Sequence, residues 1–394
     1  MPSIPRLSFE DTIKRLQNLQ PQHHAPYLAM YSTWLGGIVT DPALMLVPID
    51  DHLVHRGDGI FEAFKCVQGN IYLLDAHLDR LERSAELIDL SWPMTRKELH
   101  EAVLETIVAA NTQDSLIRLY ISRGPGDFSP NPYASIGSQL YIVATTLSQP
   151  DPKVREHGCS LALSKIPLKP GIFSTVKSCN YLPNALMKKE AVDRGVDYTV
   201  GVDENGFLAE GPTENLGIVT QDLEFRVPCF DRILRGTTQV RAMELARKLL
   251  DTGELTAIKE INIQPQDIYQ AREVIMFGTT FDALPVISCQ GQTISDGQPG
   301  PISRRLYELL RRDHDSDHID AVSRAHDRMN ALIDDLLTLA REGDEVGPLE
   351  AVDLDACVDR CWRNVDTDDA TVRLRTERTM YADRSRLQQL LENL

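Results

Sequence analysis

Two residues of this sequence have the types and surroundings that covalent chemistry on a carbonyl group needs. Lys177 follows a Thr-Val pair and precedes a polar, turn-prone Ser-Cys-Asn, which predicts a strand end with the amine facing a cavity. An amine held there is a candidate nucleophile towards a carbonyl carbon. About thirty residues later, Glu210 ends another predicted strand, before a Gly-Pro turn. A lysine for a Schiff base and a carboxylate that keeps a pyridine nitrogen protonated are the groups that a pyridoxal phosphate site requires.

Two further patterns offer the groups that a phosphate needs. Thr237 and Thr238 stand where a long amphipathic helix is predicted to begin, and the N-terminus of a helix suits an anion. Thr279 and Thr280 follow an apolar strand in a similar Gly-Thr-Thr pattern. Each pattern also has an ordinary explanation, because threonine is a common N-cap and most lysines are solvated surface charges.

Composition places the chain among soluble globular proteins. Its 394 residues, 42% apolar and 25% charged, allow two or three domains with a large core. The formal net charge of −17 argues against a nucleic-acid partner, because affinity for phosphate backbones comes from clustered Lys and Arg.

The seven cysteines include no C-x-x-C pair, which predicts reduced thiols. Cys357 and Cys361 are four residues apart without nearby histidines, so we expect packing rather than a metal site there. The N-terminus lacks the basic and apolar regions of a signal peptide, and no run of about 18 apolar residues occurs. We therefore expect a cytoplasmic protein with no membrane partner and no bound metal.

Residues 1–149 are predicted to form a small α/β domain that ends in a Pro-rich linker near Ser148 to Lys153. In the strand after Gly57-Asp-Gly, Ile60, Glu62 and Phe64 alternate with Phe61 and Ala63, which predicts two distinct faces. Helices are predicted at Phe9–Leu19 and Arg96–Ala110, and a third helix is predicted to begin at His77 with Asp75 as its cap. Strands are predicted within Tyr27–Ile38 and at Leu44–Pro48, Ile71–Leu74, Leu116–Arg123 and Leu140–Thr146.

Residues 150–312 are predicted to form a larger domain that contains the lysine and the glutamate. Asn205-Gly206 marks a hairpin within Tyr198–Glu210. The other predicted elements are strands at Cys159–Ser164, Ile218–Thr220, Leu223–Val227, Val274–Gly278 and Val286–Ile294 and helices at Ala185–Arg194, Thr237–Leu250 and Pro301–Arg312.

Residues 313–394 differ in composition from the rest, with 20 acidic residues, 10 arginines and no lysine. Apolar spacing predicts an amphipathic helix over 319–337 and further helices over 354–365 and 385–394. The runs that begin at His326 and Arg386 resemble an internal piece of sensor histidine kinases of the halophilic archaeal type. Neither His318 nor His326 has a phosphoacceptor context, so we expect a partial, non-catalytic, mainly helical appendage.

The first 312 residues or so resemble the class IV pyridoxal-phosphate enzymes, which include branched-chain aminotransferases, D-amino-acid transaminases and aminodeoxychorismate lyases. The likeness is greatest to the plant-type D-amino-acid transaminase branch, and four motifs in order carry it: His52-Leu-Val-His-Arg-Gly, Gly124-Pro-Gly-Asp-Phe, Thr175-Val-Lys-Ser-Cys-Asn-Tyr-Leu-Pro-Asn and Ala209-Glu-Gly-Pro. The resemblance implies a two-domain α/β (α+β) fold, a smaller N-terminal domain, a larger cofactor-binding domain, and a homodimer.

The resemblance also implies roles for single residues. Lys177 becomes the Schiff-base lysine and Glu210 the partner of the pyridine nitrogen. Arg80 becomes a phosphate ligand, because its planar fork pairs two oxygens. The four threonines named above join it at the phosphate.

The substrate remains open at this stage. Arg118 and Arg123 are candidates to bind a substrate carboxylate, and the related enzymes carry an aromatic residue where this chain has His55-Arg56. Phe61-Glu62-Ala63 resembles the transaminase pattern more than the lyase pattern, so we expect amino-group transfer from a D-amino acid or a branched-chain L-amino acid to a 2-oxo acid. Two alternatives remain: an aminodeoxychorismate lyase, and a non-enzymatic scaffold assembled through the kinase-like helix.

Overall fold

The computed structural model describes residues 4–19, 21–148, 150–314, 350–353 and 379–382. The chain divides into two compact units, Met1–His318 and Ile319–Leu394. In the second unit, β15 (Glu350–Asp353) pairs antiparallel with β16 (Thr379–Ala382), and neither strand was predicted. The predicted helices over 319–337, 354–365 and 385–394 lie outside the described residues.

The first sheet of the Met1–His318 unit is antiparallel, with the strand order β2-β1-β6-β5-β3-β4. Its alternating apolar residues give it one face for a core. Helices α3 (Leu74–Leu87) and α4 (Arg96–Ala110) contribute to the same core as Ile60 and Phe64 of the sheet. The strands are β1 (Tyr27–Ser32), β2 (Gly37–Val39), β3 (Gly59–Val67), β4 (Asn70–Ile71), β5 (Ser115–Ser122) and β6 (Gln139–Thr146).

The second sheet is mixed, with the order β11-β10-β9-β12-β13-β7-β8 and β14 paired to β13. Its strands bury both faces: Ile275 and Phe277 of β12 enter a core with helix α8 (Thr237–Asp251) and the helical residues 301–314, and Val274 and Met276 enter a second core. The strands are β7 (Cys159–Leu163), β8 (Tyr198–Val200), β9 (Asn215–Val219), β10 (Glu224–Val227), β11 (Ala257–Glu260), β12 (Glu273–Gly278), β13 (Asp282–Cys289) and β14 (Gln292–Thr293).

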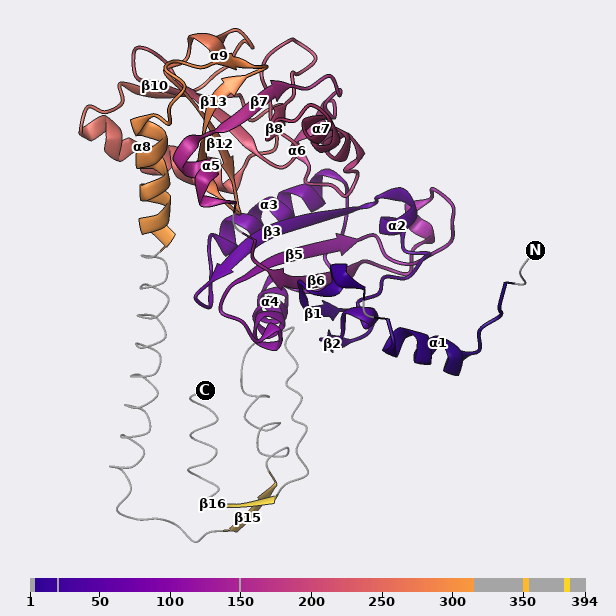
Figure 1. Cartoon of the computed structure of the whole chain (residues 1–394). Helices are drawn as coiled ribbons and strands as arrows, with labels where there is room; N and C mark the ends of the chain where they lie inside the picture. The colour runs from indigo at the N-terminus through magenta and orange to yellow at the C-terminus, as the bar shows by residue number, and fades with distance from the viewer. Residues whose placement is uncertain (1–3, 20, 149, 315–349, 354–378, 383–394) are drawn as a thin grey trace, which may run out of the picture. The chain divides into compact units, whose positions relative to one another are not determined.

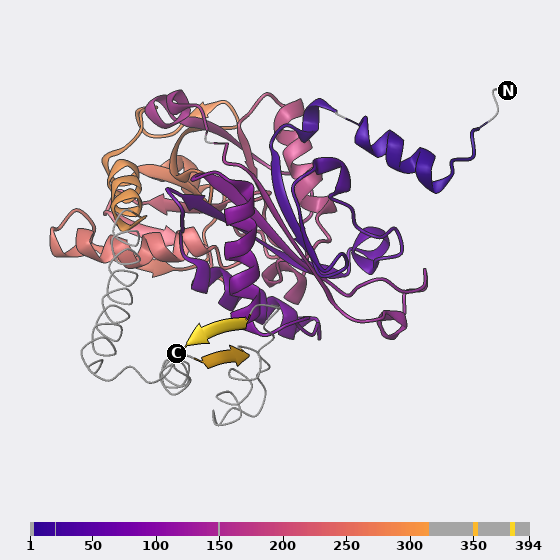
Figure 2. The ribbon, with the colours of Figure 1, turned by 90° about the horizontal axis from the view of Figure 1, so that it is seen from below.

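The two sheets lie next to each other, and α3 lies at the boundary between them (Figure 1). Helix α1 (Phe9–Gln17) has no buried residue and projects from the six-stranded sheet in both ribbon views (Figures 1 and 2). The remaining short helices are η1 (Gln22–His24), η2 (Pro42–Leu44), α2 (His52–Arg56), η3 (Pro132–Ala134), α5 (Pro152–His157), α6 (Ile172–Thr175), α7 (Leu182–Asp193) and α9 (Asp267–Gln270).

Several local predictions were wrong. Leu44–Pro48 is not a strand: Leu44 ends a 3-10 turn that Asp41 caps, and residues 45–48 form no regular element. Asp75 does not cap α3 but lies in its first turn, where its charge still suits the helix dipole. The predicted linker already contains the start of α5, whose N-cap is Asp151.

Candidate active site

Lys177 lies in an extended segment that attaches to the start of β3. The N–H of Phe61 donates to the carbonyl of Lys177 at 2.9 Å, and the N–H of Cys179 donates to the carbonyl of Gly59 at 2.8 Å. The segment follows the short helix α6, so the prediction that Lys177 ends a regular strand was wrong. These backbone bonds fix the lysine at the junction of the two sheets.

The Lys177 amine faces a cavity of about 410 Å³ that Phe61, Arg118, Thr279 and Thr280 also line. Its Nζ lies 4.6 Å from the centre of the Phe61 ring. Burial lowers the pKa of Lys177 to about 8, and the positive charge of Arg80 acts in the same direction while Glu62 and Glu210 oppose it. A larger fraction of this amine is therefore neutral near pH 7 than of an ordinary lysine.

One face of the first sheet forms a wall of this cavity. In the register of β3 and β5, Phe61 pairs with Tyr120 and Ala63 pairs with Arg118, so all four side chains project from the same face. Arg118 donates from Nη1 to the Thr145 hydroxyl at 3.0 Å. Since guanidinium has five N–H groups, Arg118 keeps donors for an anion in the cavity.

Glu210 and Lys177 line a second, small cavity of about 20 Å³. The N–H of Leu234 donates to Glu210 Oε2 at 3.0 Å, which orients the carboxylate. Burial raises the pKa of Glu210 to about 7, although the Lys169 ammonium and the bond from Leu234 act in the opposite direction. A cation placed against Glu210 would therefore favour its ionised form.

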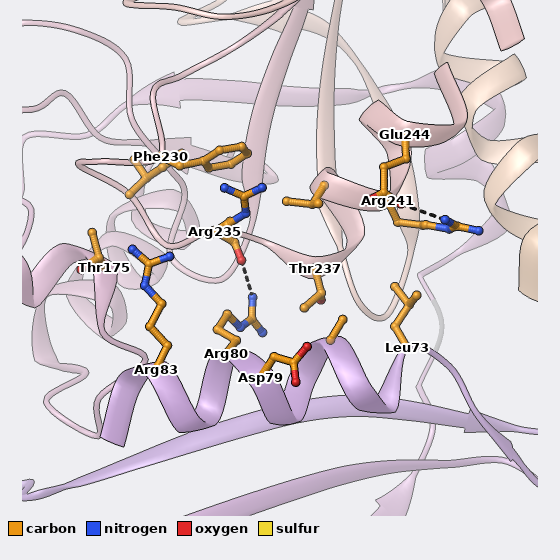
Figure 3. A pocket seen from close by; sticks show the side chains of 13 residues that line it. Leu73, Asp79, Arg80, Arg83, Thr175, Phe230, Arg235, Thr237, Arg241 and Glu244 are labelled. Atoms are coloured by element: carbon orange, nitrogen blue, oxygen red, sulfur yellow. Dashed lines mark hydrogen bonds and ion pairs between the residues drawn. The ribbon is translucent and has the colours of Figure 1, made fainter. Parts of the chain in front are cut away.

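Arg80 and Thr237 line a third cavity, of about 270 Å³, between α3 and the start of α8 (Figure 3). Arg80 Nη1 donates to the Arg235 carbonyl at 3.0 Å, across the boundary between the two sheets. Helix α8 begins after Gly236, which has no side chain to accept from the first N–H groups of this 15-residue helix. Those N–H groups, with Arg80 opposite, are donors for a phosphate.

The structure distributes the other predicted residues over different places. Thr238 is buried in the first turn of α8, beside Thr237. His55 and Arg56 line a separate cavity of about 770 Å³. Arg123 instead donates to both carboxylate oxygens of Asp58 at 3.1 Å and to the carbonyls of Ile88 and Asp89.

Sequence reasoning missed three side chains that contact this region. Tyr181 lines both cavities that contain Lys177, and it belongs to the motif that identified the lysine. Lys169 lines the small cavity with Glu210, and its signal was only a Pro-Leu-Lys-Pro context. Glu62 pairs with Arg80, and its signal was a charge on the buried face of an apolar strand.

The side chains and backbone groups at this site fit pyridoxal phosphate. A partly neutral, buried amine suits its aldehyde, the buried carboxylate of Glu210 suits its ring nitrogen, and Arg80 with the uncapped start of α8 suits its phosphate. In the described part of the chain, His, Cys, Asp and Glu side chains form no group of three that could hold a metal ion. None of the described helices combines the length and apolar character needed to cross a membrane.

Comparisons with known proteins agree on a family. The model of the family described as amino-transferase class IV matches residues 59–289. The chloroplastic D-amino-acid transaminase of Arabidopsis thaliana is 36% identical over 314 residues, which cover 79% of this chain and 82% of that protein. These matches lend no support to the histidine kinase resemblance of residues 313–394.

Solved structures give the same result. The branched-chain amino acid aminotransferase of Escherichia coli has a TM-score of 0.65 at 26% identity, with 72% of this chain and 92% of that chain covered. The branched-chain enzyme of the archaeon Thermoproteus uzoniensis, solved with norvaline, has a TM-score of 0.65 at 25% identity, with 73% of this chain and 94% of that chain covered. The mixed α/β fold with two sheets confirms the predicted fold class, and the chain belongs to the class IV aminotransferase family.

Proposed function

We propose that this aminotransferase moves the amino group of a D-amino acid to a 2-oxo acid, with pyridoxal 5'-phosphate attached to Lys177. The observation that carries the proposal is the small cavity that Lys177 shares with Glu210, beside the Arg80 and α8 phosphate donors. The preference for D-amino acids rests on the 36% identity to the Arabidopsis enzyme. Branched-chain L-amino acids are the second candidate, because the solved relatives carry that name.

The bound cofactor would supply an electron sink that lets the substrate lose its Cα proton. Glu210 would hold the ring nitrogen protonated, and the bond from Leu234 keeps its carboxylate in place for this. Arg80 and the first N–H groups of α8 would bind the phosphate, with Thr237, Thr238, Thr279 and Thr280 as the proposed neighbours.

Lys177 would act twice, first as the point of attachment and then, once released, as the proton carrier. Its Nζ must be neutral to accept a proton, and the lowered pKa supports this role. The Phe61 ring, 4.6 Å from Nζ, lines the same cavity as the amine, so the proton carrier would lie beside the space proposed for the substrate.

Arg118 is the proposed partner of the substrate carboxylate, because it lines the same cavity as Lys177. His55 and Arg56 remain candidates through their own, larger cavity. Arg123 is the weakest of the four, since Asp58 and two carbonyls already take its donors. The two-domain division at residues 149 and 312, the homodimer and the cytoplasmic location also remain proposals.

The test combines attachment with turnover. Purified protein is incubated with pyridoxal phosphate, reduced with borohydride, digested and analysed by mass spectrometry. We expect one cofactor-sized mass addition, on the peptide that contains Lys177, and none at this position in Lys177→Ala. Lys188→Ala is the matched control, because Lys188 lies on α7 and lines none of the cavities described.

The substrate class is tested with D-alanine, D-methionine, L-leucine and L-valine, each with 2-oxoglutarate. Faster transfer from the D-amino acids supports the proposal, and faster transfer from the L-amino acids replaces it with the branched-chain activity. Formation of 4-aminobenzoate from aminodeoxychorismate without transfer would establish the lyase instead. Absence of any modification on Lys177 would overturn the role of the cofactor.

A further inference from the structure

A single carboxylate connects the residues at the phosphate end of the site. Glu62 of β3 has a fully buried side chain. Its Oε1 accepts from Arg80 Nε at 2.7 Å, and its Oε2 accepts from Arg80 Nη2 and from His77 Nδ1, each also at 2.7 Å. Burial alone would raise the pKa of Glu62, but Arg80 and His77 lower it well below its usual range, so the carboxylate is ionised.

The ion pair between Glu62 and Arg80 determines how the Arg80 guanidinium faces the cavity. Bonds from Nε and Nη2 to one carboxylate fix the plane of the guanidinium, and the bond from Nη1 to the Arg235 carbonyl fixes its far end. Three of the five N–H groups are used in this way, which leaves two for a ligand. Without Glu62, the same side chain could rotate out of the cavity.

His77 extends the connection to α8. Because Glu62 is an ionised acceptor, His77 Nδ1 must carry the proton that it donates. Burial lowers the pKa of His77, and Arg80 and Lys177 lower it further despite the opposing effect of Glu62, so the ring is neutral. Its Nε2 is then an acceptor, and the Thr237 hydroxyl donates to it at 3.2 Å.

We propose that Glu62 is a positioning residue for the phosphate-binding end of the site, which it aligns through Arg80 on one wall and through His77 and Thr237 on the other. Arg80 and His77 belong to α3, which packs on the first sheet, and Thr237 begins α8, which packs on the second. The Thr237 hydroxyl is directed to His77, so Thr237 would offer the ligand its backbone N–H. This inference rests on the proposed use of pyridoxal phosphate.

The experiment separates alignment of the phosphate site from general support of the fold. Cofactor-free protein is titrated with pyridoxal phosphate and with pyridoxal, which has the same aldehyde and ring but no phosphate. The dissociation constant of pyridoxal divided by that of pyridoxal phosphate measures what the phosphate contributes to binding. In Glu62→Gln we expect this ratio to fall about tenfold or more, because pyridoxal phosphate loses affinity and pyridoxal keeps it.

Two further variants complete the comparison. Arg80→Gln should lower the ratio at least as much, and Glu62→Gln added to Arg80→Gln should lower it little further, since Glu62 acts through Arg80. Asp75→Asn is the matched control, because Asp75 lies on the same helix as Arg80 but pairs with Arg96 in an exposed position. We expect its ratio to stay within about threefold of wild type.

Three results would count against the inference or its basis. If Glu62→Gln weakens both ligands equally, or neither, Glu62 does not position the phosphate site. If Glu62→Gln shows no cooperative thermal unfolding, Glu62→Asp decides, since it keeps the charge on a side chain one methylene shorter; an unchanged ratio in Glu62→Asp would reject the proposal. If wild type itself binds neither ligand, the proposed cofactor is wrong.

Discussion

At the scale of single residues, the same burial has opposite effects on the two groups that face the proposed ring of the cofactor. It lowers the pKa of Lys177 to about 8 and raises that of Glu210 to about 7. Both shifts bring the groups close to neutral pH, where a small change in surroundings changes the protonation state. Such shifts are common at sites that transfer protons.

The lowered pKa of Lys177 gives a testable pH dependence. Only the neutral amine attacks an aldehyde, so the rate of covalent attachment should rise with pH and level off above about pH 8. At pH 7 about a tenth of the amine is then neutral, far more than for a lysine of pKa about 10.4. Stopped-flow absorbance of cofactor-free protein mixed with pyridoxal phosphate measures this; a midpoint near pH 10 would contradict it.

Sequence could predict the residues that stand in unusual local patterns, but not those that need distant partners. Lys177 and Glu210 were candidates from their strand and turn contexts alone. The role of Glu62 depends on His77 and Arg80, which meet it only when α3 packs on β3. Arg123 was a candidate for the substrate, and the sequence offered no sign that Asp58 would bind its guanidinium.

At the scale of elements, strand β3 and helix α8 place most of the site. The alternation along β3 was predicted from the sequence, and the structure confirms it, with Glu62 towards α3 and Phe61 towards the Lys177 cavity. The predicted helix Thr237–Leu250 agrees with α8 at its start and differs by one residue at its end, but its cap is Gly236 and not a threonine. Periodicity therefore fixes where the helix lies, whereas the capping residue depends on how closely a neighbouring strand approaches.

Gly236 is needed because of that close approach. A Cβ at Gly236 would overlap the Asn215 side chain, which donates from Nδ2 to the Leu234 carbonyl at 3.0 Å. We expect Gly236→Ala to displace the first turn of α8, to lower the free energy of unfolding by about 1–3 kcal/mol and to weaken binding of pyridoxal phosphate. Urea denaturation and ligand titration measure the two effects.

The matched control for this change is Gly37→Ala. At Gly37 an added Cβ would meet open space, and the backbone conformation is an ordinary one, so the free energy of unfolding should change by less than about 0.5 kcal/mol. If Gly236→Ala were as stable as Gly37→Ala and bound the cofactor equally well, the close approach of Asn215 would not be the reason that position 236 needs glycine.

At the scale of the whole molecule, buried polar bonds join the two sheets. Lys65 of the first sheet pairs with Asp282 of the second at 2.5 Å, and both side chains are almost fully buried. A buried ion pair of this kind requires both partners, since either charge alone would be costly. No local pattern in the sequence pairs residues so far apart, so the junction between the sheets could not be predicted.

The helical residues 301–314 also join distant parts of the Met1–His318 unit. Asp313 accepts from Arg241 of α8 at 2.6 and 2.8 Å and from the Tyr72 hydroxyl at 2.8 Å. We expect Asp313→Asn to lower the free energy of unfolding by about 1–2 kcal/mol at pH 7. Chemical denaturation measures it, and Asp193→Asn, which alters an exposed pair with Lys189, is the control.

The loss of unfolding free energy in Asp313→Asn should depend on pH. Burial opposes ionisation, but Arg241 and Tyr72 lower the pKa of Asp313 below its usual value of 3.8 in the folded state. The stabilisation is therefore complete above about pH 4–5 and disappears as the pH falls through the folded pKa. A difference between wild type and variant that grows on acidification would contradict this assignment.

The two faces of β3 have a consequence for directed evolution. Phe61 and Ala63 line the cavity proposed for the substrate, whereas Glu62, between them in sequence, points to the opposite face and holds the phosphate end. A library that randomises only Phe61 and Ala63 can change substrate preference while the hold on the cofactor stays intact. Selection for new substrates should therefore accumulate replacements at these two positions, and Glu62 should survive it.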